Sequence, residues 1–134
     1  RRIEERTIFV CISREIKISR EMAPRVLLHR RAADGLLGGL WELPGVQGRL
    51  MEREAAAWAA ELGLTADQIE LLPESRHIFS HVEWHMQGYR LSVRPVAVPR
   101  GYVWATGEEL ARLYALPSAF RAYTACLPEW LSGE

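Results

Sequence analysis

The sequence predicts a layered domain of the α/β or α+β class, with a mixed β-sheet flanked by helices. Its segments follow the order strands, one helix, more strands and then C-terminal helices, which is typical of such a layered arrangement. The chain has 134 residues, of which 49% are hydrophobic and 25% charged, so it has the length and composition of one globular domain with its own core. We therefore expect a single domain over residues 1–134.

The N-terminal quarter of the chain is predicted to be mostly extended. Residues 6–13 (RTIFVCIS) are rich in β-branched and aromatic side chains and indicate a first strand. Residues 15–19 and 24–31 predict a second and a third extended segment. The Asp-Gly step within residues 32–35 indicates a turn after the third segment.

A glycine-rich apolar stretch at residues 35–45 (GLLGGLWELPG) leads towards the clearest helix of the chain. Its glycines allow backbone segments to approach closely, and its last two residues, Pro44-Gly45, predict a second turn. Residues 50–62 predict the helix, because apolar side chains recur there at helical spacing, at Ala55, Trp58, Ala59 and Leu62. Gly63 supplies the stop signal of this helix.

The next part of the chain is predicted to return to strands. A short strand is expected at residues 69–72, and the strong alternation within residues 76–98 indicates two strands or one long bent pair. Within residues 76–91, apolar side chains stand at the even positions Ile78, Val82, Trp84 and Met86, and polar ones at the odd positions His77, His81, Glu83, His85 and Gln87. Phe79 interrupts this alternation with an aromatic ring on the polar face, and Ser80 with a hydroxyl on the apolar face. Such local rules tend to fail at turns or functional sites. We infer a strand-to-strand loop with Phe79, Ser80 and His81 at its tip; the alternative is a tight turn with a core anchor.

Further helices are predicted near the C-terminus. Thr106 and Glu109 form a capping box that opens a helix reaching to about residue 114. Pro117 is expected to begin the last helix, and Pro128 to end it.

The bulk properties exclude several classes of protein. No apolar run approaches the length that crosses a bilayer, no secretory leader is visible, and the first residue, Arg1, suggests a piece of a longer polypeptide. The net charge is zero, but residues 1–31 carry nine Arg or Lys against four Asp or Glu, a local charge of +5. Such a segment suits a phosphate backbone, or is simply a solvated face. Cys11 and Cys126 are expected to be buried thiols in a reducing cytoplasm.

Three evenly spaced histidines and five tryptophans are further candidates for a site. His77, His81 and His85 recur every four residues, but on a strand such positions are about 13 Å apart, too far for one metal ion, so no metal is expected. His29 is expected to be a structural histidine at the end of a strand. The tryptophans are expected in the core or at a domain interface, at Trp41, Trp58, Trp84, Trp104 and Trp130.

The glycine-rich stretch and the helix after it resemble the Nudix family. In that family a glycine-containing loop leads into a helix whose glutamates hold magnesium, and the motif ends in an Arg-Glu-x-x-Glu-Glu-x-Gly pattern. With the final glycine at Gly63, the arginine and the three glutamates of the pattern fall on Ala56, Ala57, Ala60 and Glu61. One carboxylate cannot supply the oxygen ligands that magnesium requires, so the resemblance implies the fold without the hydrolase. Glu52 and Glu54 lie upstream, in a different register, as solvent-facing residues that suit the helix start.

Three stretches narrow the resemblance to the C-terminal domain of MutY-type adenine DNA glycosylases. They are residues 35–44 (GLLGGLWELP), 77–81 (HIFSH) and 114–119 (YALPSA). This resemblance implies a role in base-excision repair: recognition of 8-oxoguanine opposite adenine in duplex DNA, while a separate N-terminal helix-hairpin-helix domain with an iron–sulfur cluster removes the adenine. It implies that domain as a partner within one polypeptide, a bacterial cytoplasmic location at the DNA, and no membrane contact. The chain alone is then expected to hold no cofactor, to lack glycosylase activity and to bind DNA weakly.

The resemblance assigns the lesion contact to Phe79, Ser80 and His81. Guanine oxidised at its eighth carbon gains an oxygen acceptor and turns its N7 acceptor into an N–H donor. The hydroxyl of Ser80 can donate and accept, so it can meet both groups, and a mismatched polar pair would cost about 1–3 kcal/mol. Phe79 is expected to wedge against the base stack, and His81 to donate to a phosphate or to the base edge.

Two other functions stay open from the sequence. The first is an active Nudix hydrolase of oxidised nucleotides with an unusual metal site. The second is a non-catalytic protein-interaction module that uses the same fold without contacting a base.

Overall fold

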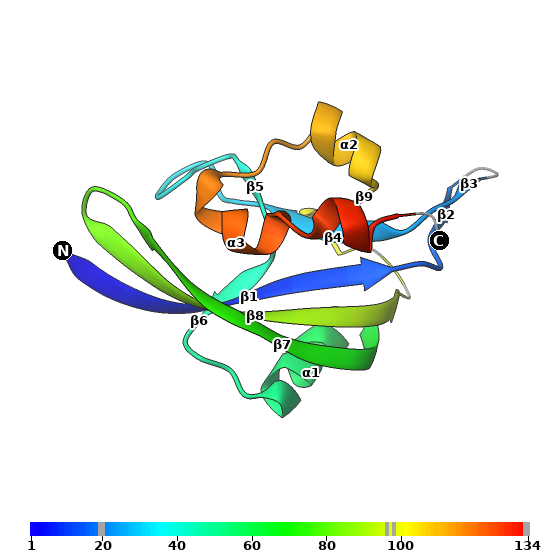
Figure 1. Cartoon of the computed structure of the whole chain (residues 1–134), viewed down its shortest axis with the longest axis horizontal. Coiled ribbons are helices and arrows are strands. Elements are labelled where there is room, and N and C mark those ends of the chain that lie inside the picture. Colours follow the sequence, from blue (N-terminus) through cyan, green and yellow to red (C-terminus); the bar gives the residue numbers. More distant parts are fainter. Residues whose placement is uncertain (19–20, 96, 98, 133–134) are drawn as a thin grey trace.

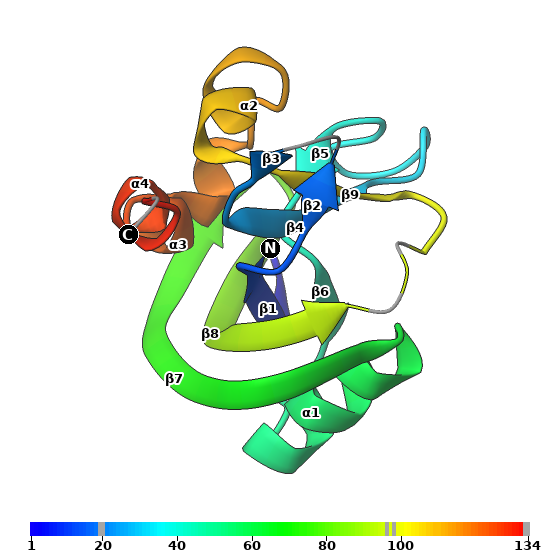
Figure 2. The same ribbon diagram turned by 90° about the vertical axis from the view of Figure 1, so that its right-hand side faces the viewer.

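The computed structural model describes residues 1–18, 21–95, 97 and 99–132. A seven-stranded mixed sheet forms its centre, with helices on both faces (Figures 1 and 2). This architecture confirms the predicted fold class. No helix within these residues is long and apolar enough to span a membrane.

The sheet combines antiparallel pairs with one long parallel pair. Its main path runs through β5 (Trp41–Glu42), β4 (Arg25–Arg30), β1 (Arg2–Ser13), β8 (Val82–Pro95) and β7 (Leu64–Ile78). Strand β6 (Gly45–Gln47) pairs with β1, β9 (Tyr102–Ala105) pairs with β4, and β2 (Lys17–Ile18) pairs with β3 (Glu21–Met22) in a separate ribbon. The parallel pair joins β1 to β8, from Arg2 opposite Val82 to Ile12 opposite Ser92.

The first strand is longer than its sequence pattern predicts. The expected strand at residues 6–13 is confirmed, but β1 begins at Arg2, because its polar first residues pair with the start of β8. The expected segment at residues 15–19 contains β2, and its last residue, Ser19, lies outside the described part of the chain. The third predicted segment is confirmed as β4, and the reversal after it includes Gly35 at φ +88°.

The helix predicted at residues 50–62 is α1 (Glu52–Glu61), and it covers one face of the sheet. Its predicted apolar stripe faces the sheet: Ala55 and Ala59 are buried, and the Trp58 ring stacks on Phe9 of β1 with the ring centroids 3.9 Å apart. Gly63 follows the helix with φ +84°, the left-handed conformation that its stop signal predicts.

The other face of the sheet is covered by the C-terminal elements, α2 (Gly107–Arg112), the short 3-10 helix Ser118–Phe120, α3 (Arg121–Thr124) and α4 (Leu127–Trp130). The capping box of α2 is confirmed, since the Thr106 hydroxyl accepts from the Glu109 N–H. The predicted last helix is wrong in its extent, because three short helices stand where one was expected. Pro128 lies in the first turn of α4 and so does not end a helix. Backbone N–H groups in a first turn have no partner within the helix, so the N–H that proline lacks is not missed there.

Two further expectations from the sequence are wrong, and one is too narrow. Pro44-Gly45 forms no turn: Gly45 begins β6, where it packs so closely on β1 that a Cβ would lie 2.9 Å from the Thr7 carbonyl oxygen. Cys126 is exposed, because it lies between α3 and α4 on the outer side, whereas Cys11 is buried as expected. The short strand predicted at residues 69–72 is the middle of the fifteen-residue β7.

Candidate functional site

The three residues predicted to contact the lesion form the tip of the β7–β8 hairpin. The hairpin is closed by the Phe79 N–H, which donates to the Val82 carbonyl over 2.8 Å. The His81 carbonyl accepts from the N–H of Arg2 over 3.1 Å, so the tip is also tied to the start of β1. Figure 1 shows this tip and the N-terminus at the same end of the molecule. The predicted strand-to-strand loop is therefore confirmed.

Phe79 is turned towards the core, contrary to the expectation that it lies on the polar face. Its ring centroid lies 4.6 Å from that of His77 and 5.0 Å from that of Trp84, and the ring packs against the main core. The exposed apolar side chain here is Ile78, which is 55% exposed. The direction of Phe79 follows from the pairing of His77 with Trp84, since residues opposite each other on paired strands point to the same face of the sheet. Odd residues of β7 therefore point inwards together with even residues of β8. The alternation therefore changes phase at the loop.

Ser80 and His81 are exposed at the tip, and Phe79 fixes the loop to the core beneath them. Trp84, which supports Phe79, is 1% exposed and also contacts the Phe120 ring at 5.9 Å. The structure thus presents the Ser80 hydroxyl to solvent on a supported loop. It combines the two interpretations of the sequence pattern, a tight turn with a core anchor and an accessible hydroxyl.

Two arginine guanidinium groups lie against Trp84. Their central carbons lie 4.8 Å (Arg6) and 5.5 Å (Arg31) from the ring centroid. Each arginine is also paired with a carboxylate, Arg6 with Glu4 at 3.4 Å and Arg31 with Glu42 at 2.7 Å. A cation over an indole face in a largely dry environment is stabilised by about 2 kcal/mol. Neither arginine was predicted as a site residue from the sequence; the available signal for Arg31 was its position four residues before the glycine-rich stretch.

The glycine-rich stretch between β4 and β5 adopts a strained backbone. Gly35, Leu37 and Gly39 all have positive φ. Leu37, at φ +56°, adopts the left-handed conformation, which costs free energy for a residue with a bulky side chain. The loop is held by side chains of the preceding strand end: Arg30 Nε donates to the Gly39 carbonyl over 3.1 Å, and Arg31 Nε to the Leu36 carbonyl over 2.8 Å.

Glu42, at the end of this stretch, is a buried carboxylate that is held by two partners. It accepts from Arg31 at 2.7 Å and contacts Nδ1 of His29 at 2.8 Å, while only 6% of its side chain is exposed. The paired partners explain how a carboxylate can be buried there. They also confirm His29 as a structural residue.

The donor set on α1 does not fit the magnesium ion that a Nudix fold implies. Ala56, Ala57 and Ala60 stand where three of the family's four polar side chains are expected, and their methyl groups cannot coordinate a cation. Upstream, Glu54 accepts a hydrogen bond from the Met51 N–H over 2.8 Å and so acts at the helix start. Within the described residues, no group of three or more His, Cys, Asp or Glu side chains is arranged to hold a metal ion.

Charges of both signs surround the loop. The Arg2 side chain is 74% exposed and lies 3.2 Å from Glu4, while Arg1 lies 3.6 Å from Glu83. A hydrogen bond from His85, 2.6 Å long, lowers the pKa of Glu83 below its ordinary value, partial burial opposes that shift, and the nearby Arg1 adds to it. The basic bias of residues 1–31 is thus partly neutralised around the tip, although the Arg2 side chain, 74% exposed, stays accessible to a phosphate.

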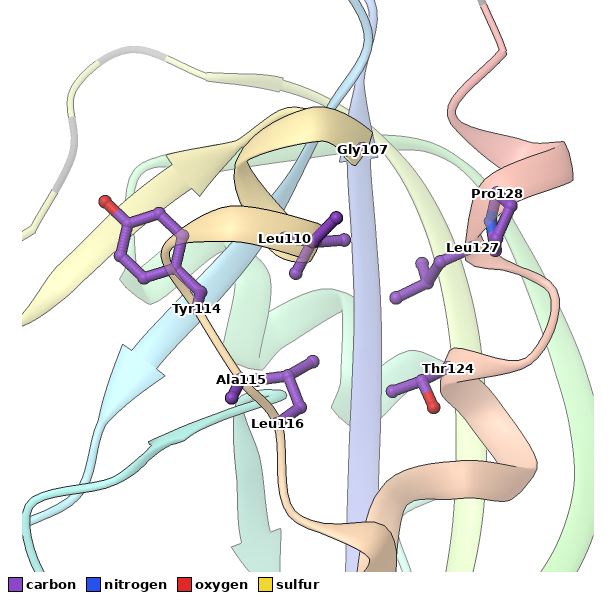
Figure 3. Close-up of a pocket in the computed structure, with 9 residues that line it drawn as sticks. Gly107, Leu110, Tyr114, Ala115, Leu116, Thr124, Leu127 and Pro128 are labelled. Carbon is purple, nitrogen blue, oxygen red and sulfur yellow. The ribbon is translucent and has the colours of Figure 1, made fainter.

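A pocket of about 540 Å³ lies elsewhere, among the C-terminal helices (Figure 3). Leu110, Leu116 and Leu127 point towards its centre, whereas the Tyr114 hydroxyl points away. None of its lining residues belongs to the β7–β8 hairpin or carries a charge. Its lining therefore suits an apolar group and offers no cation to a phosphate.

Comparisons with known proteins agree with this geometry. The family model described as "NUDIX domain" matches residues 18–125. Human adenine DNA glycosylase is 34% identical over 128 aligned residues, which cover 84% of this chain and 23% of the human protein. The mouse enzyme is 34% identical over 114 residues, 75% of this chain and 22% of that protein. The chain therefore spans less than a quarter of the length of these relatives.

The chain is also similar to solved structures of an adenine DNA glycosylase domain and of a Nudix hydrolase. The C-terminal domain of mouse MUTYH, solved in a complex with human PCNA, superposes with a TM-score of 0.67 at 27% identity, over 98% of this chain and 92% of that one. A Nudix hydrolase from M. smegmatis, RenU, has a TM-score of 0.57 at 24% identity, over 94% of this chain and 84% of that one. The second likeness shows the fold alone.

Proposed function

Because the chain belongs to the NUDIX domain family and is similar to the C-terminal domain of an adenine DNA glycosylase, we propose that it recognises 8-oxoguanine opposite adenine in duplex DNA. In this role it assists adenine removal by a catalytic domain of the same polypeptide. The similarity to adenine DNA glycosylases supports a role in DNA repair.

The observation that carries the proposal is the exposed Ser80 on a loop that the core supports. Phe79 beneath it packs on Trp84, and Arg2 pairs with the backbone of His81 beside it. A hydroxyl can donate to the new oxygen of 8-oxoguanine and accept from its new N–H, while guanine presents neither group. Holding the hydroxyl on a fixed loop lowers the entropy that is lost on binding.

The neighbouring residues take different roles in the proposal. The inward-facing ring of Phe79 anchors the loop, and this leaves Ile78, which is 55% exposed, as the apolar side chain that can touch the base stack. His81, exposed at the tip, and Arg2, with a 74% exposed side chain, are placed to donate to phosphates. Since the net charge is zero, binding of the isolated chain to DNA is expected to be weak.

The chemistry of adenine removal is assigned to a separate domain. The residues on α1 do not fit a metal, and the two cysteines of this chain cannot supply the four thiolates that an iron–sulfur cluster takes. We propose that such a cluster belongs to the catalytic domain of the full-length glycosylase, and that the protein acts on DNA in the bacterial cytoplasm.

A titration of the isotope-labelled chain with short duplexes tests the proposal. Three duplexes of one sequence would carry 8-oxoguanine:adenine, guanine:adenine or guanine:cytosine at the centre, and amide chemical shifts report even weak binding. We expect the largest shifts at residues 78–81, with the tightest binding to the 8-oxoguanine duplex. Equal affinity for all three duplexes, or shifts confined to the apolar pocket, would contradict the proposal.

A further inference from the structure

We propose that Arg31 is a positioning residue that couples the glycine-rich stretch (residues 35–45) to the loop that carries Ser80. The guanidinium group of Arg31 contacts both structures at once, directly on one side and through Trp84 on the other. This inference rests on the proposed function, because it assigns to Arg31 the placement of the hydroxyl that recognises the lesion.

On one side, Arg31 holds the glycine-rich stretch through three separate polar contacts. Its Nε donates to the Leu36 carbonyl over 2.8 Å, and its backbone N–H donates to the Leu40 carbonyl over 2.9 Å. Its Nη1 donates to the buried carboxylate of Glu42 over 2.7 Å. The Leu36 carbonyl directly precedes Leu37, the residue with φ +56°, so the Nε contact acts beside the most strained point of the stretch.

On the other side, the same guanidinium lies on the support of the Ser80 loop. Its central carbon is 5.5 Å from the centroid of the Trp84 ring, and Trp84 in turn contacts the Phe79 ring at 5.0 Å. Only 20% of the Arg31 side chain is exposed, so its attraction to the indole is little screened by water. Three contacts therefore connect Leu36 to Phe79: Arg31 to Leu36, Arg31 to Trp84, and Trp84 to Phe79.

The contacts require an arginine at this position. A planar guanidinium presents donors in several directions and a flat face for stacking, whereas the ammonium group of lysine is a single point charge. A lysine at position 31 would keep the charge beside Glu42 but would lose either the Leu36 contact or the Trp84 contact.

The adjacent Arg30 provides a matched control. It donates from Nε to the Gly39 carbonyl of the same stretch over 3.1 Å, but its guanidinium lies over Trp41, at 5.9 Å, and not over Trp84. The two arginines therefore differ in whether they reach the support of the Ser80 loop.

The test compares Arg31→Lys with Arg30→Lys in two measurements on the whole chain. The first is the amide chemical shift of Phe79, Ser80 and His81 in the free protein. The second is the ratio of affinities for the 8-oxoguanine:adenine and guanine:adenine duplexes. We expect Arg31→Lys to move the three amide resonances and to lower the affinity ratio by about fivefold, and Arg30→Lys to change neither. If Arg31→Lys folds poorly, the double variant Arg31→Met with Glu42→Gln replaces it in the test, because it leaves no unpaired buried carboxylate. We expect the same shifts and the same loss of preference in that variant.

Two outcomes overturn the inference. If the resonances and the affinity ratio stay unchanged in both Arg31 variants, Arg31 does not couple the two structures. If Arg30→Lys and Arg31→Lys have equal effects, the loss of any contact to the glycine-rich stretch disturbs the Ser80 loop, and the contact of Arg31 with Trp84 has no special role. If the wild-type chain itself shows no preference for 8-oxoguanine, the proposed function fails, while the resonances of the free protein still decide whether Arg31 acts on the Ser80 loop.

Discussion

The Phe79 ring packs edge-on against Trp84, with the ring centroids 5.0 Å apart and the planes at 71°. Because Trp84 is 1% exposed and touches Phe120 as well, this pair joins the hairpin tip to the main core between the sheet and the C-terminal helices. The exposed Ser80 therefore directly follows Phe79, a residue that is held in place by packing against the main core.

Replacing Phe79 with alanine is expected to loosen the loop and to destabilise the domain. The half-buried ring would leave a cavity over Trp84, so we expect a loss of about 2–3 kcal/mol in the free energy of unfolding, together with faster amide exchange at Ser80 and His81. Urea unfolding and hydrogen exchange measure the two effects. Ile78→Ala is the control, since that side chain is 55% exposed and should change stability by less than about 0.5 kcal/mol. Similar losses in both variants would contradict the anchor role.

A side chain at Gly88 is expected to destabilise the fold, because this residue lies against the Tyr123 ring of α3. A Cβ at position 88 would lie 2.9 Å from Tyr123 Cδ1, and that ring is fixed by the hydrogen bond from its hydroxyl to the Pro73 carbonyl, 2.9 Å long. We expect Gly88→Ala to cost about 1–3 kcal/mol in thermal or urea unfolding. Gly107→Ala, where the nearest atom is 3.9 Å away at the start of α2, should be neutral or slightly stabilising. A neutral Gly88→Ala would show that α3 packs less closely on β8.

The two cysteines are expected to differ sharply in reactivity. Burial raises the pKa of the Cys11 thiol well above its ordinary value, so this group forms no thiolate, whereas Cys126 is exposed. A thiol reagent should therefore label Cys126 rapidly in the folded chain and Cys11 only after unfolding. Mass spectrometry of the labelled chain, with Cys126→Ser as control, separates the sites. Rapid labelling of Cys11 in the folded protein would contradict the burial of β1.

Stability should depend on Glu83 in a pH-dependent manner. Its pKa is lowered in the folded state by the hydrogen bond from His85, so it stabilises the folded chain above the ordinary pKa of glutamate, and this contribution is lost as the pH falls through the folded-state pKa. Glu83→Gln should therefore be less stable than wild type at about pH 7 and should approach it at about pH 3 in urea unfolding. Glu70→Gln, at an exposed carboxylate 3.8 Å from Arg90, should show little difference at either pH. A constant difference between Glu83→Gln and wild type at both pH values would show that the pair does not act through charge.

Local signals in the sequence predicted the parts of the fold that depend on neighbouring residues. The apolar stripe of α1, its stop at Gly63 and the capping box at Thr106 and Glu109 were confirmed, because each involves residues within a few positions of one another. The parallel pairing of β1 with β8 joins residues 80 positions apart, and this long-range contact extends β1 to Arg2 beyond any local signal.

The same distinction explains the errors at the candidate site. A single alternating phase was assumed through residues 76–91, but the pairing of His77 with Trp84 reverses the phase at the loop and turns Phe79 inwards. The support by Arg6 and Arg31 was also missed, since Arg6, Arg31 and Trp84 come from separate strands and strand ends and meet only in the folded chain. The position of the loop tip was predicted correctly, because the hydroxyl and the aromatic ring interrupt the local pattern there.

The affinity ratio of Ser80→Ala for two duplexes tests the central claim most directly. The wild-type chain and the variant would be titrated with matched duplexes that contain 8-oxoguanine:adenine or guanine:adenine, with Ser80→Thr as the variant that keeps a hydroxyl. Losing the hydroxyl should lower the preference for 8-oxoguanine by about fivefold to a hundredfold, the equivalent of about 1–3 kcal/mol, while affinity for the guanine duplex stays nearly constant. A Ser80→Ala variant that retains the full wild-type preference would contradict the account.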